Sequence, residues 1–326
     1  MTMQQQVLKI AILDDYAGVA VDLADWTGLG DVTVFRDTLK DEAEVIERLK
    51  PFDVLCVMRE RTPLPGQIIR ALPNLRLIVT SGTRNLSIDL AAAAARSIPV
   101  CGTDMRMTMT AELTMGLILA LERRIVVEAN SLTAGGWQIG LGRDLHGLTL
   151  GLVGLGKVGR QMAQLGKAFG MSVAAWSQNL TPELCAEHGV TYCNTLTSLM
   201  GQSDVVSIHV VLSDRSRGMR DAAALAAMRP DATLVNTSRG PIVNQSDLLD
   251  ALHRNRLAGA ALDVFDSEPL AGDDPIMDQE LIRTGKLLLA PHLGYASLQT
   301  FTLFYRQMAE AVAAWKEGNP IRVLAQ

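Results

Sequence analysis

Residues 148–170 read LTLGLVGLGKVGRQMAQLGKAFG and place glycines in the pattern G-x-G-x-x-G. An apolar run precedes the pattern, and apolar residues recur at spacings of four and three after it, which predicts a strand, a glycine turn and a helix. In such a unit Gly154 allows a tight turn, Gly156 lets a pyrophosphate approach the backbone, and Gly159 lets the helix pack on the strand. The helix start would add free N–H groups and a positive dipole at Lys157 and Val158. The stretch predicts a dinucleotide-binding unit, and a glycine turn without a ligand is the alternative.

The alternation of apolar runs and helical patterns continues outward from this stretch. Six short runs suit parallel strands of a doubly wound sheet, at residues 149–153, 172–176, 205–209, 233–236, 259–264 and 286–290. The first hundred residues show a similar βα alternation. The sequence therefore predicts an α/β protein with two layered domains.

Two further helical patterns lie outside this alternation. Residues 110–130 form a helical run with small or aliphatic residues on nearly every side of its first half. Such a helix is buried either within the chain or at the seam of a dimer, and we favour the seam, which predicts a homodimer. Residues 297–318 have apolar positions at spacings of three and four, as in one amphipathic helix, which we expect to pack on the first domain.

Composition excludes several classes of protein. The 326 residues are 48% hydrophobic and 4% aromatic, which suits packed layers and excludes a disordered chain. Thirty Lys and Arg against thirty-five Asp and Glu give a net charge of −5, so we expect no nucleic-acid partner. No apolar stretch reaches the roughly 20 residues that a bilayer requires, and the first residues do not resemble a signal peptide, so we expect no membrane association and a cytoplasmic protein. Four cysteines without a C-x-x-C pair predict reduced thiols and no metal site.

The choice between two nicotinamide cofactors depends on the end of the second strand of the dinucleotide unit. An acidic residue there usually binds the ribose of NAD, but residues 176–179 read WSQN and place Ser177 at that point. No carboxylate repels the 2′-phosphate of NADP, and no Arg or Lys follows before residue 190 to attract it. NAD is favoured and NADP stays open.

Polar residues that follow the predicted strands are candidates for chemistry, because ligands bind beyond the carboxyl ends of parallel strands. Arg239, Glu268 and His292 each follow such a strand. Hydride exchange with a nicotinamide needs a cation for the substrate carboxylate and a group that moves the hydroxyl proton. Arg239 can hold the carboxylate, His292 can transfer the proton, and Glu268 can orient His292. Each residue also has a structural alternative: Arg239 as a surface turn residue, His292 as a buried structural histidine and Glu268 as a solvated loop acid.

Four segments together resemble the D-isomer-specific 2-hydroxyacid dehydrogenase family over essentially the whole chain: residues 154–159, LVNTSRG at 234–240, LDVFDSEPL at 262–270 and APHLGY at 290–295. The resemblance implies a Rossmann cofactor domain at residues 105–295, inserted into a flavodoxin-like substrate domain at residues 1–104 and 296–326, with a cleft at their junction. It also implies a homodimer joined through the long helix.

The resemblance implies specific roles as well. Arg239, Glu268 and His292 would be the catalytic set, and Ser81 and Gly82 would donate backbone N–H groups to the substrate carboxylate. The cofactor would contact further residues beside the glycine turn, namely Thr110, Ser177, His209, Val210, Thr237, Asp263 and Gly294. The chain departs from the family pattern at Ser177, where Asp is usual, and at residues 209–213, which lack the usual proline and threonine.

The substrate stays open among 2-hydroxy and 2-keto acids. Arg59 and Arg61 lie in a segment that resembles the substrate-facing segment of phosphoglycerate dehydrogenases, where they could hold a phosphate; a solvated Arg-Glu-Arg turn is the alternative. Glyoxylate and hydroxypyruvate also fit. Two other functions are known for this fold. One is a catalytically idle NAD(H)-sensing scaffold, similar to a co-repressor, and the intact Arg239, Glu268 and His292 argue against it. The other is formate oxidation.

Overall fold

The computed structural model describes residues 7–106, 108–219 and 221–325. The chain divides into two compact units, one formed by residues 1–106 and 297–326 and the other by residues 107–296. We call them the first unit and the second unit. The divisions fall within two residues of the boundaries expected at 104 and 296.

The first unit is built on a six-stranded sheet in the order β13-β5-β4-β3-β1-β2. Its strands are β1 (Lys9–Ile12), β2 (Asp31–Val34), β3 (Val54–Val57), β4 (Leu77–Thr80), β5 (Val100–Cys101) and β13 (Val323–Ala325). Its helices are α1 (Ala20–Leu23), α2 (Glu42–Leu49), α3 (Gly66–Ala71), α4 (Leu90–Ala95) and α13 (Leu298–Lys316). Every residue of β3 and β4 is buried, as expected for central parallel strands covered on both faces. The strand that sequence patterns did not predict is β13, which pairs antiparallel with β5, so this sheet is parallel except at one edge.

The amphipathic helix expected after Ser297 is confirmed as α13. The Ser297 side chain accepts the Thr300 N–H and caps the helix start. Phe304 and Tyr305 are fully buried, and α13 contacts β4 and α1. The last helix of the chain therefore completes the core of the unit that the first strands begin.

The second unit contains a seven-stranded sheet in the order β12-β11-β10-β9-β6-β7-β8. The six predicted strands are present as β6 (Thr149–Val153), β7 (Ser172–Trp176), β9 (Val205–Ile208), β10 (Thr233–Asn236), β11 (Gly259–Leu262) and β12 (Leu287–Leu289). β8 (Thr191–Tyr192) is an additional edge strand, and the strands pair in parallel. The helices are α5 (Met109–Glu122), α6 (Ile125–Thr133), α7 (Lys157–Ala168), α8 (Pro182–Glu187), α9 (Leu196–Gln202), α10 (Ala222–Ala226), α11 (Gln245–His253) and α12 (Gln279–Thr284).

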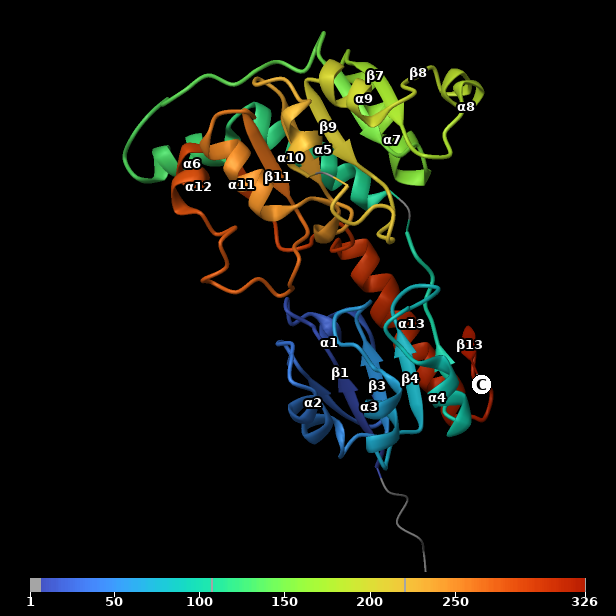
Figure 1. Cartoon of the computed structure of the whole chain (residues 1–326). Helices are drawn as coiled ribbons and strands as arrows, with labels where there is room; N and C mark the ends of the chain where they lie inside the picture. Colours follow the sequence, from blue (N-terminus) through green and yellow to red (C-terminus); the bar gives the residue numbers. More distant parts are fainter. Residues whose placement is uncertain (1–6, 107, 220, 326) are drawn as a thin grey trace, which may run out of the picture. The chain divides into compact units, whose positions relative to one another are not determined.

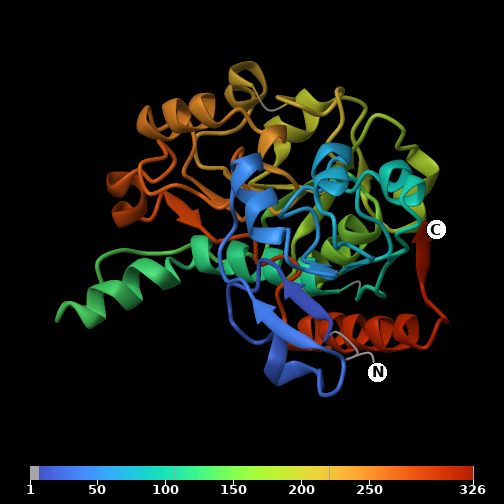
Figure 2. The same ribbon diagram turned by 90° about the horizontal axis from the view of Figure 1, so that it is seen from below.

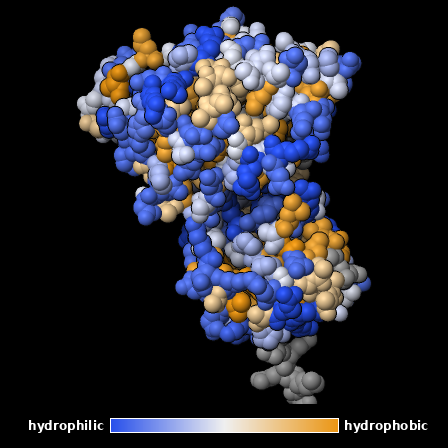
Figure 3. Space-filling model, viewed as in Figure 1, coloured by the Kyte–Doolittle hydropathy of each residue, from blue (hydrophilic) through white to orange (hydrophobic). Residues whose placement is uncertain are grey.

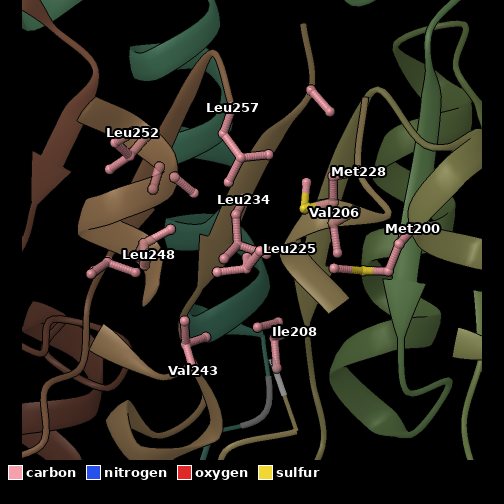
Figure 4. Packing of buried hydrophobic residues seen from close by; sticks show 14 of the residues in the cluster. Met200, Val206, Ile208, Leu225, Met228, Leu234, Val243, Leu248, Leu252 and Leu257 are labelled. Carbon is pink, nitrogen blue, oxygen red and sulfur yellow. The ribbon is translucent and has the colours of Figure 1, made fainter. Parts of the chain in front are cut away.

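Both faces of this second sheet are buried. Figure 4 shows the cluster on one face, where Val206, Ile208 and Leu234 contact residues of the surrounding helices. Val205 and Val235, one position along the same strands, belong to the cluster on the other face. Side chains alternate across a strand, so near-continuous apolar runs bury both faces at once. This packing fixes the positions of the strand ends that carry the polar residues.

The prediction of one continuous helix at residues 110–130 is wrong, because the structure has two helices there, α5 and α6. α5 ends at Glu122, whose carbonyl oxygen accepts the Arg143 N–H at 2.8 Å, and Arg124 adopts a left-handed conformation with φ of 55° before α6 begins. α5 contacts α7, β10 and β11 within its own unit, where its buried apolar side chains form part of the core. α6 projects from α5 as an arm, drawn in green in Figure 2.

Large apolar side chains are exposed on this arm and on the chain that follows it. They are Ile125, Val126, Leu132, Trp137, Ile139 and Leu141. In Figure 3 hydrophobic side chains, in orange, reach the surface at the upper left, where Figure 1 draws the chain after α6. Such a concentration of exposed apolar side chains is typical of an interaction surface.

Candidate active site

The glycine turn between β6 and α7 has the geometry that its pattern predicts. Gly154 has a φ of 103°, and its N–H donates to the Trp176 carbonyl at 2.8 Å. A Cβ on Gly159 would lie 2.1 Å from the Gly154 carbonyl oxygen, so only glycine allows the helix to approach the turn. A Cβ on Gly156 would meet nothing within 4 Å. The backbone at Gly156 is therefore open on the side where a pyrophosphate would approach.

The first two residues of α7 are Lys157 and Val158, and no side chain caps this helix start. Its N–H groups and its dipole are therefore available to an anion. The turn fits the pyrophosphate of a dinucleotide on these local features.

A cavity of about 400 Å³ adjoins the turn. Five predicted cofactor residues line it, namely Gly154, Gly156, Ser177, His209 and Val210. His209 is enclosed: its Nε2 lies 2.9 Å from Ser207 Oγ, and burial lowers the pKa of His209 to about 4, so the ring is neutral near pH 7. Sequence reasoning missed two cations that also line the cavity, Arg160 and Arg215. No local spacing signals Arg215, because it lies on the loop after β9 and not beside Ser177.

His292 and Glu268 are in direct contact. His292 Nδ1 lies 2.5 Å from Glu268 Oε2, while Glu268 Oε1 accepts the Phe265 N–H at 2.9 Å. The two side chains are 21% and 19% exposed, respectively. The carboxylate is held at both oxygens, so it fixes the orientation of the imidazole through Nδ1.

The loop that carries His292 is held by Asp263. His292 has a φ of 53°, a left-handed conformation that is costly for a residue with a Cβ. The Asp263 carboxylate, which is fully buried, accepts the N–H groups of Leu293 at 2.6 Å and Gly294 at 2.8 Å. Thr110 donates its hydroxyl to the Gly294 carbonyl at 2.9 Å. The structure thus brings Thr110, Asp263 and Gly294 together directly beyond His292.

Arg239 follows β10, whose neighbour in the sheet is β11. The Asn236 side chain donates to the Arg239 carbonyl at 2.9 Å, and Arg239 Nη1 donates to the Ser238 carbonyl at 2.8 Å. A Cβ on Gly240 would lie 2.1 Å from the carbonyl carbon of Phe265, so the loops after β10 and β11 pack closely because residue 240 is glycine.

The strands that precede Arg239, Glu268 and His292 are adjacent in the sheet, in the order β10, β11, β12. Parallel strands bring their carboxyl ends to one edge, so the three predicted catalytic residues follow neighbouring strands at the same edge. Thr237, predicted near the cofactor, lies in the loop after β10, and its hydroxyl is 2.7 Å from that of Thr114 on α5.

In the first unit, Arg59 lies beside Ser81 and Gly82. The Arg59 N–H donates to Ser81 Oγ at 2.9 Å, and a Cβ on Gly82 would lie 2.3 Å from Arg59 Nη1. The expected backbone donors are already used: the Ser81 N–H donates to the Val57 carbonyl at 3.0 Å, and the Gly82 N–H donates to Thr103 Oγ1 at 2.8 Å. The expectation that these two N–H groups are free for a carboxylate is wrong.

The next two residues are candidates that sequence reasoning missed. Within the described part of the first unit, the N–H groups of Thr83 and Arg84 donate to no protein acceptor. They directly follow Gly82, which has a left-handed φ of 89°. A turn of this kind can direct successive N–H groups towards an anion.

Arg61 lies in a different environment from Arg59. Thr62 Oγ1 donates to both oxygens of Asp14, at 3.1 and 2.9 Å, and Asp14 is buried at the end of β1. Burial raises the pKa of Asp14, although hydrogen bonds from Thr38 and Thr62 and the charge of Arg61 oppose that rise. The segment that contains Arg59 and Arg61 is therefore fixed to the first unit at both ends.

Among residues 7–106, 108–219 and 221–325, no cluster of three His, Cys, Asp or Glu side chains could hold a metal ion. In the same ranges, none of the helices has the length and hydrophobicity to cross a membrane.

The chain is similar to several known proteins. Residues 115–294 match the family described as D-isomer specific 2-hydroxyacid dehydrogenase, NAD binding domain. The chain is 35% identical to a glyoxylate reductase of Korarchaeum cryptofilum, over 87% of each chain. It is 31% identical to a D-3-phosphoglycerate dehydrogenase of Methanocaldococcus jannaschii, over 88% of this chain and 53% of that protein. The solved structure of a phosphoglycerate oxidoreductase from Vibrio cholerae is similar with a TM-score of 0.87 and 36% identity, over 95% of this chain and 99% of that one.

Proposed function

The chain belongs to the D-isomer-specific 2-hydroxyacid dehydrogenase family, and on that premise we propose that Arg239, Glu268 and His292 carry out its reaction on a small 2-keto acid. It is an NAD-binding oxidoreductase that acts on CH–OH donors. The observation that carries the residue assignment is the 2.5 Å contact between His292 Nδ1 and Glu268 Oε2. Bound NAD supplies the hydride acceptor in the oxidation and, when reduced, the hydride donor in the reverse direction.

His292 moves the proton. In keto-acid reduction its imidazolium gives a proton from Nε2 to the carbonyl oxygen as the carbonyl carbon is reduced. In the reverse direction the neutral ring accepts the hydroxyl proton at the same atom. Glu268 stabilises the imidazolium and keeps the ring turned so that Nε2 faces the substrate, while Asp263 holds the following backbone in place. Glu268 and Asp263 are therefore positioning residues.

Arg239 binds the substrate carboxylate. A guanidinium forms two parallel hydrogen bonds with a carboxylate and does not lose its charge at any physiological pH. The contacts around Asn236, Ser238 and Gly240 fix the backbone from which Arg239 extends. Such anchoring aligns the reacting carbon as well as binding the acid, so loss of Arg239 affects both kcat and KM.

Within the first unit, the candidate groups for an anionic substrate lie around Arg59. The side chain of Arg59 is 18% exposed and lies against Gly82, next to the backbone N–H groups of Thr83 and Arg84. These groups are proposed to receive anionic or polar atoms of the substrate. Glyoxylate and hydroxypyruvate need few such contacts, whereas a phosphorylated hydroxyacid would need the cation.

The active form is proposed to be a homodimer. The exposed apolar side chains on α6 and residues 134–141 would be covered by a second copy of the chain, because exposed apolar surface of this extent is unfavourable in water.

The test is a panel of 2-keto acids supplied with NADH, followed by the loss of nicotinamide absorbance. Wild-type chain is expected to reduce at least one small 2-keto acid. His292→Ala should lower kcat by about 10²–10⁴-fold while cofactor binding is retained. Arg239→Ala should raise KM and lower kcat together. Turnover by His292→Ala at the wild-type rate would refute the assignment of the proton carrier.

A further inference from the structure

The cavity beside the glycine turn has an unusual charge for a site that binds the adenosine end of NAD. Among the described residues that line the cavity, none is Asp or Glu. Two arginines, Arg160 and Arg215, are part of the lining. A carboxylate at the end of the second strand is the feature that binds the ribose hydroxyls of NAD and repels a 2′-phosphate. Here that position is Ser177, which can donate a hydrogen bond to an anion. The cavity therefore attracts negative charge.

Arg215 is held on a well-defined turn. Ser216 Oγ accepts the Ser213 N–H at 2.8 Å and donates to the Val211 carbonyl at 2.7 Å, and the Arg217 N–H donates to the Ser213 carbonyl at 2.9 Å. Ser216 is 6% exposed, so the turn is anchored by a buried hydroxyl. The backbone of Arg215 is thus fixed between two anchored residues while its side chain reaches the cavity.

The two arginines differ in their other contacts. Arg160 Nε donates to the Leu155 carbonyl at 3.2 Å, which ties it to the glycine turn and thus to the pyrophosphate side. In the ranges that the structure describes, Arg215 forms no ion pair and no side-chain hydrogen bond with the protein. His209, the remaining basic residue at the cavity, is neutral and adds no charge. Arg215 is consequently the cation that an additional anion would contact.

We propose that this cavity also binds the 2′-phosphate of NADP(H), with Arg215 as the phosphate-binding cation and Ser177 as a hydrogen-bond donor. This inference rests on the proposed nicotinamide-dependent function and extends it: the chain binds NADP(H) at least as tightly as NAD(H). A guanidinium and a phosphate form charge-assisted hydrogen bonds, and the site has no carboxylate to oppose them.

The test is isothermal titration calorimetry of the whole chain with NAD⁺ and NADP⁺, without substrate. The Kd for NADP⁺ should be equal to or lower than that for NAD⁺. Arg215→Ala should raise the Kd for NADP⁺ about tenfold and change that for NAD⁺ by less than about twofold. Arg217→Ala is the matched control, because it removes an exposed charge from the same turn outside the cavity lining, and it should leave both values unchanged.

Two further measurements isolate the 2′-phosphate. Adenosine 2′-monophosphate should compete with NADP⁺ better than adenosine 5′-monophosphate does, and the difference should shrink as salt is raised because the contact is exposed. Ser177→Asp should reverse the preference in favour of NAD⁺.

Tighter binding of NAD⁺ than of NADP⁺ by the wild-type chain overturns the inference and leaves the proposed function intact. An Arg215→Ala variant that weakens both cofactors equally also overturns it, because Arg215 would then contact a group common to both. Failure of both cofactors to bind would instead refute the nicotinamide-dependent function on which the inference rests.

Discussion

Replacing Glu268 with Gln tests whether the carboxylate acts through His292. The substitution keeps the size of the side chain, and the amide oxygen can still accept the Phe265 N–H. The amide nitrogen then faces His292 Nδ1, which must become an acceptor instead of a donor. The protonated imidazole, which gives the proton in keto-acid reduction, loses its counter-charge.

The size of the effect follows from Coulomb's law. Opposite charges about 4 Å apart attract by about 1 kcal/mol in water and about 4 kcal/mol at an effective dielectric constant near 20. Since His292 and Glu268 are 21% and 19% exposed, we take an intermediate value of about 2 kcal/mol. The midpoint of the alkaline limb of the pH profile should therefore move to lower pH by about 1.5 units. On that limb the rate should fall about 30-fold.

The assay is the pH dependence of kcat for reduction of a 2-keto acid, measured for wild type and Glu268→Gln with the same cofactor. Asp266→Asn is the matched control, because Asp266 is an exposed acid two residues away on the same loop, and it should not move the profile by more than a few tenths of a unit. A Glu268→Gln profile with an unchanged midpoint and only a lower plateau would show that Glu268 merely supports the loop, and would refute the reasoning.

Three other substitutions test separate parts of the structure. Arg59→Ala should lower kcat/KM about ten- to a hundredfold for a phosphorylated hydroxyacid and much less for glyoxylate, because one charge-assisted contact is lost; equal losses for the two substrates would show that Arg59 does not bind the anionic tail. Asp14→Asn should raise Tm at pH 7, since burial raises the pKa of Asp14 and its ionised form is therefore less stable in the folded chain than in the unfolded one. That gain should shrink as pH falls through the raised pKa of folded Asp14 and vanish below the ordinary Asp value, where wild-type Asp14 is protonated in both folded and unfolded states; a pH-independent gain would contradict the cause given. Arg143→Ala should cost about 2–3 kcal/mol by thermal or denaturant unfolding because it leaves the Glu122 carboxylate buried without its cation, and adding Glu122→Gln should restore part of the loss.

Most strands were predictable because each is a short apolar run that buries both of its faces. The edge strands were not. β8 consists of Thr191 and Tyr192, of which one is exposed and one half-buried, so no apolar run marks it. β13 is a strand because its backbone pairs with that of β5, which lies more than 200 residues earlier in the chain. The end of α5 likewise depends on the Arg143 N–H, which binds the Glu122 carbonyl from 21 positions away.

The candidate site shows the same division between local and distant causes. The glycine turn and the residues after β10, β11 and β12 follow from local patterns and the parallel order of the strands. The N–H groups of Ser81 and Gly82 could not be judged from sequence, because Val57 and Thr103 accept them only in the fold. Arg215 was missed because it lies 38 positions after Ser177 on another loop that lines the same cavity.

The contribution of α13 and β13 to the first unit has a consequence for synthesis on the ribosome. The strands β1 to β5 are made first, but α13, with the fully buried Phe304 and Tyr305, is made only after the roughly 190 residues of the second unit. At about 5–20 residues per second, the growing chain spends about 10–40 seconds with that part of the sheet uncovered. During that interval the apolar face of β4 is open to chaperones or to neighbouring nascent chains, so the second unit can finish folding before the first one can.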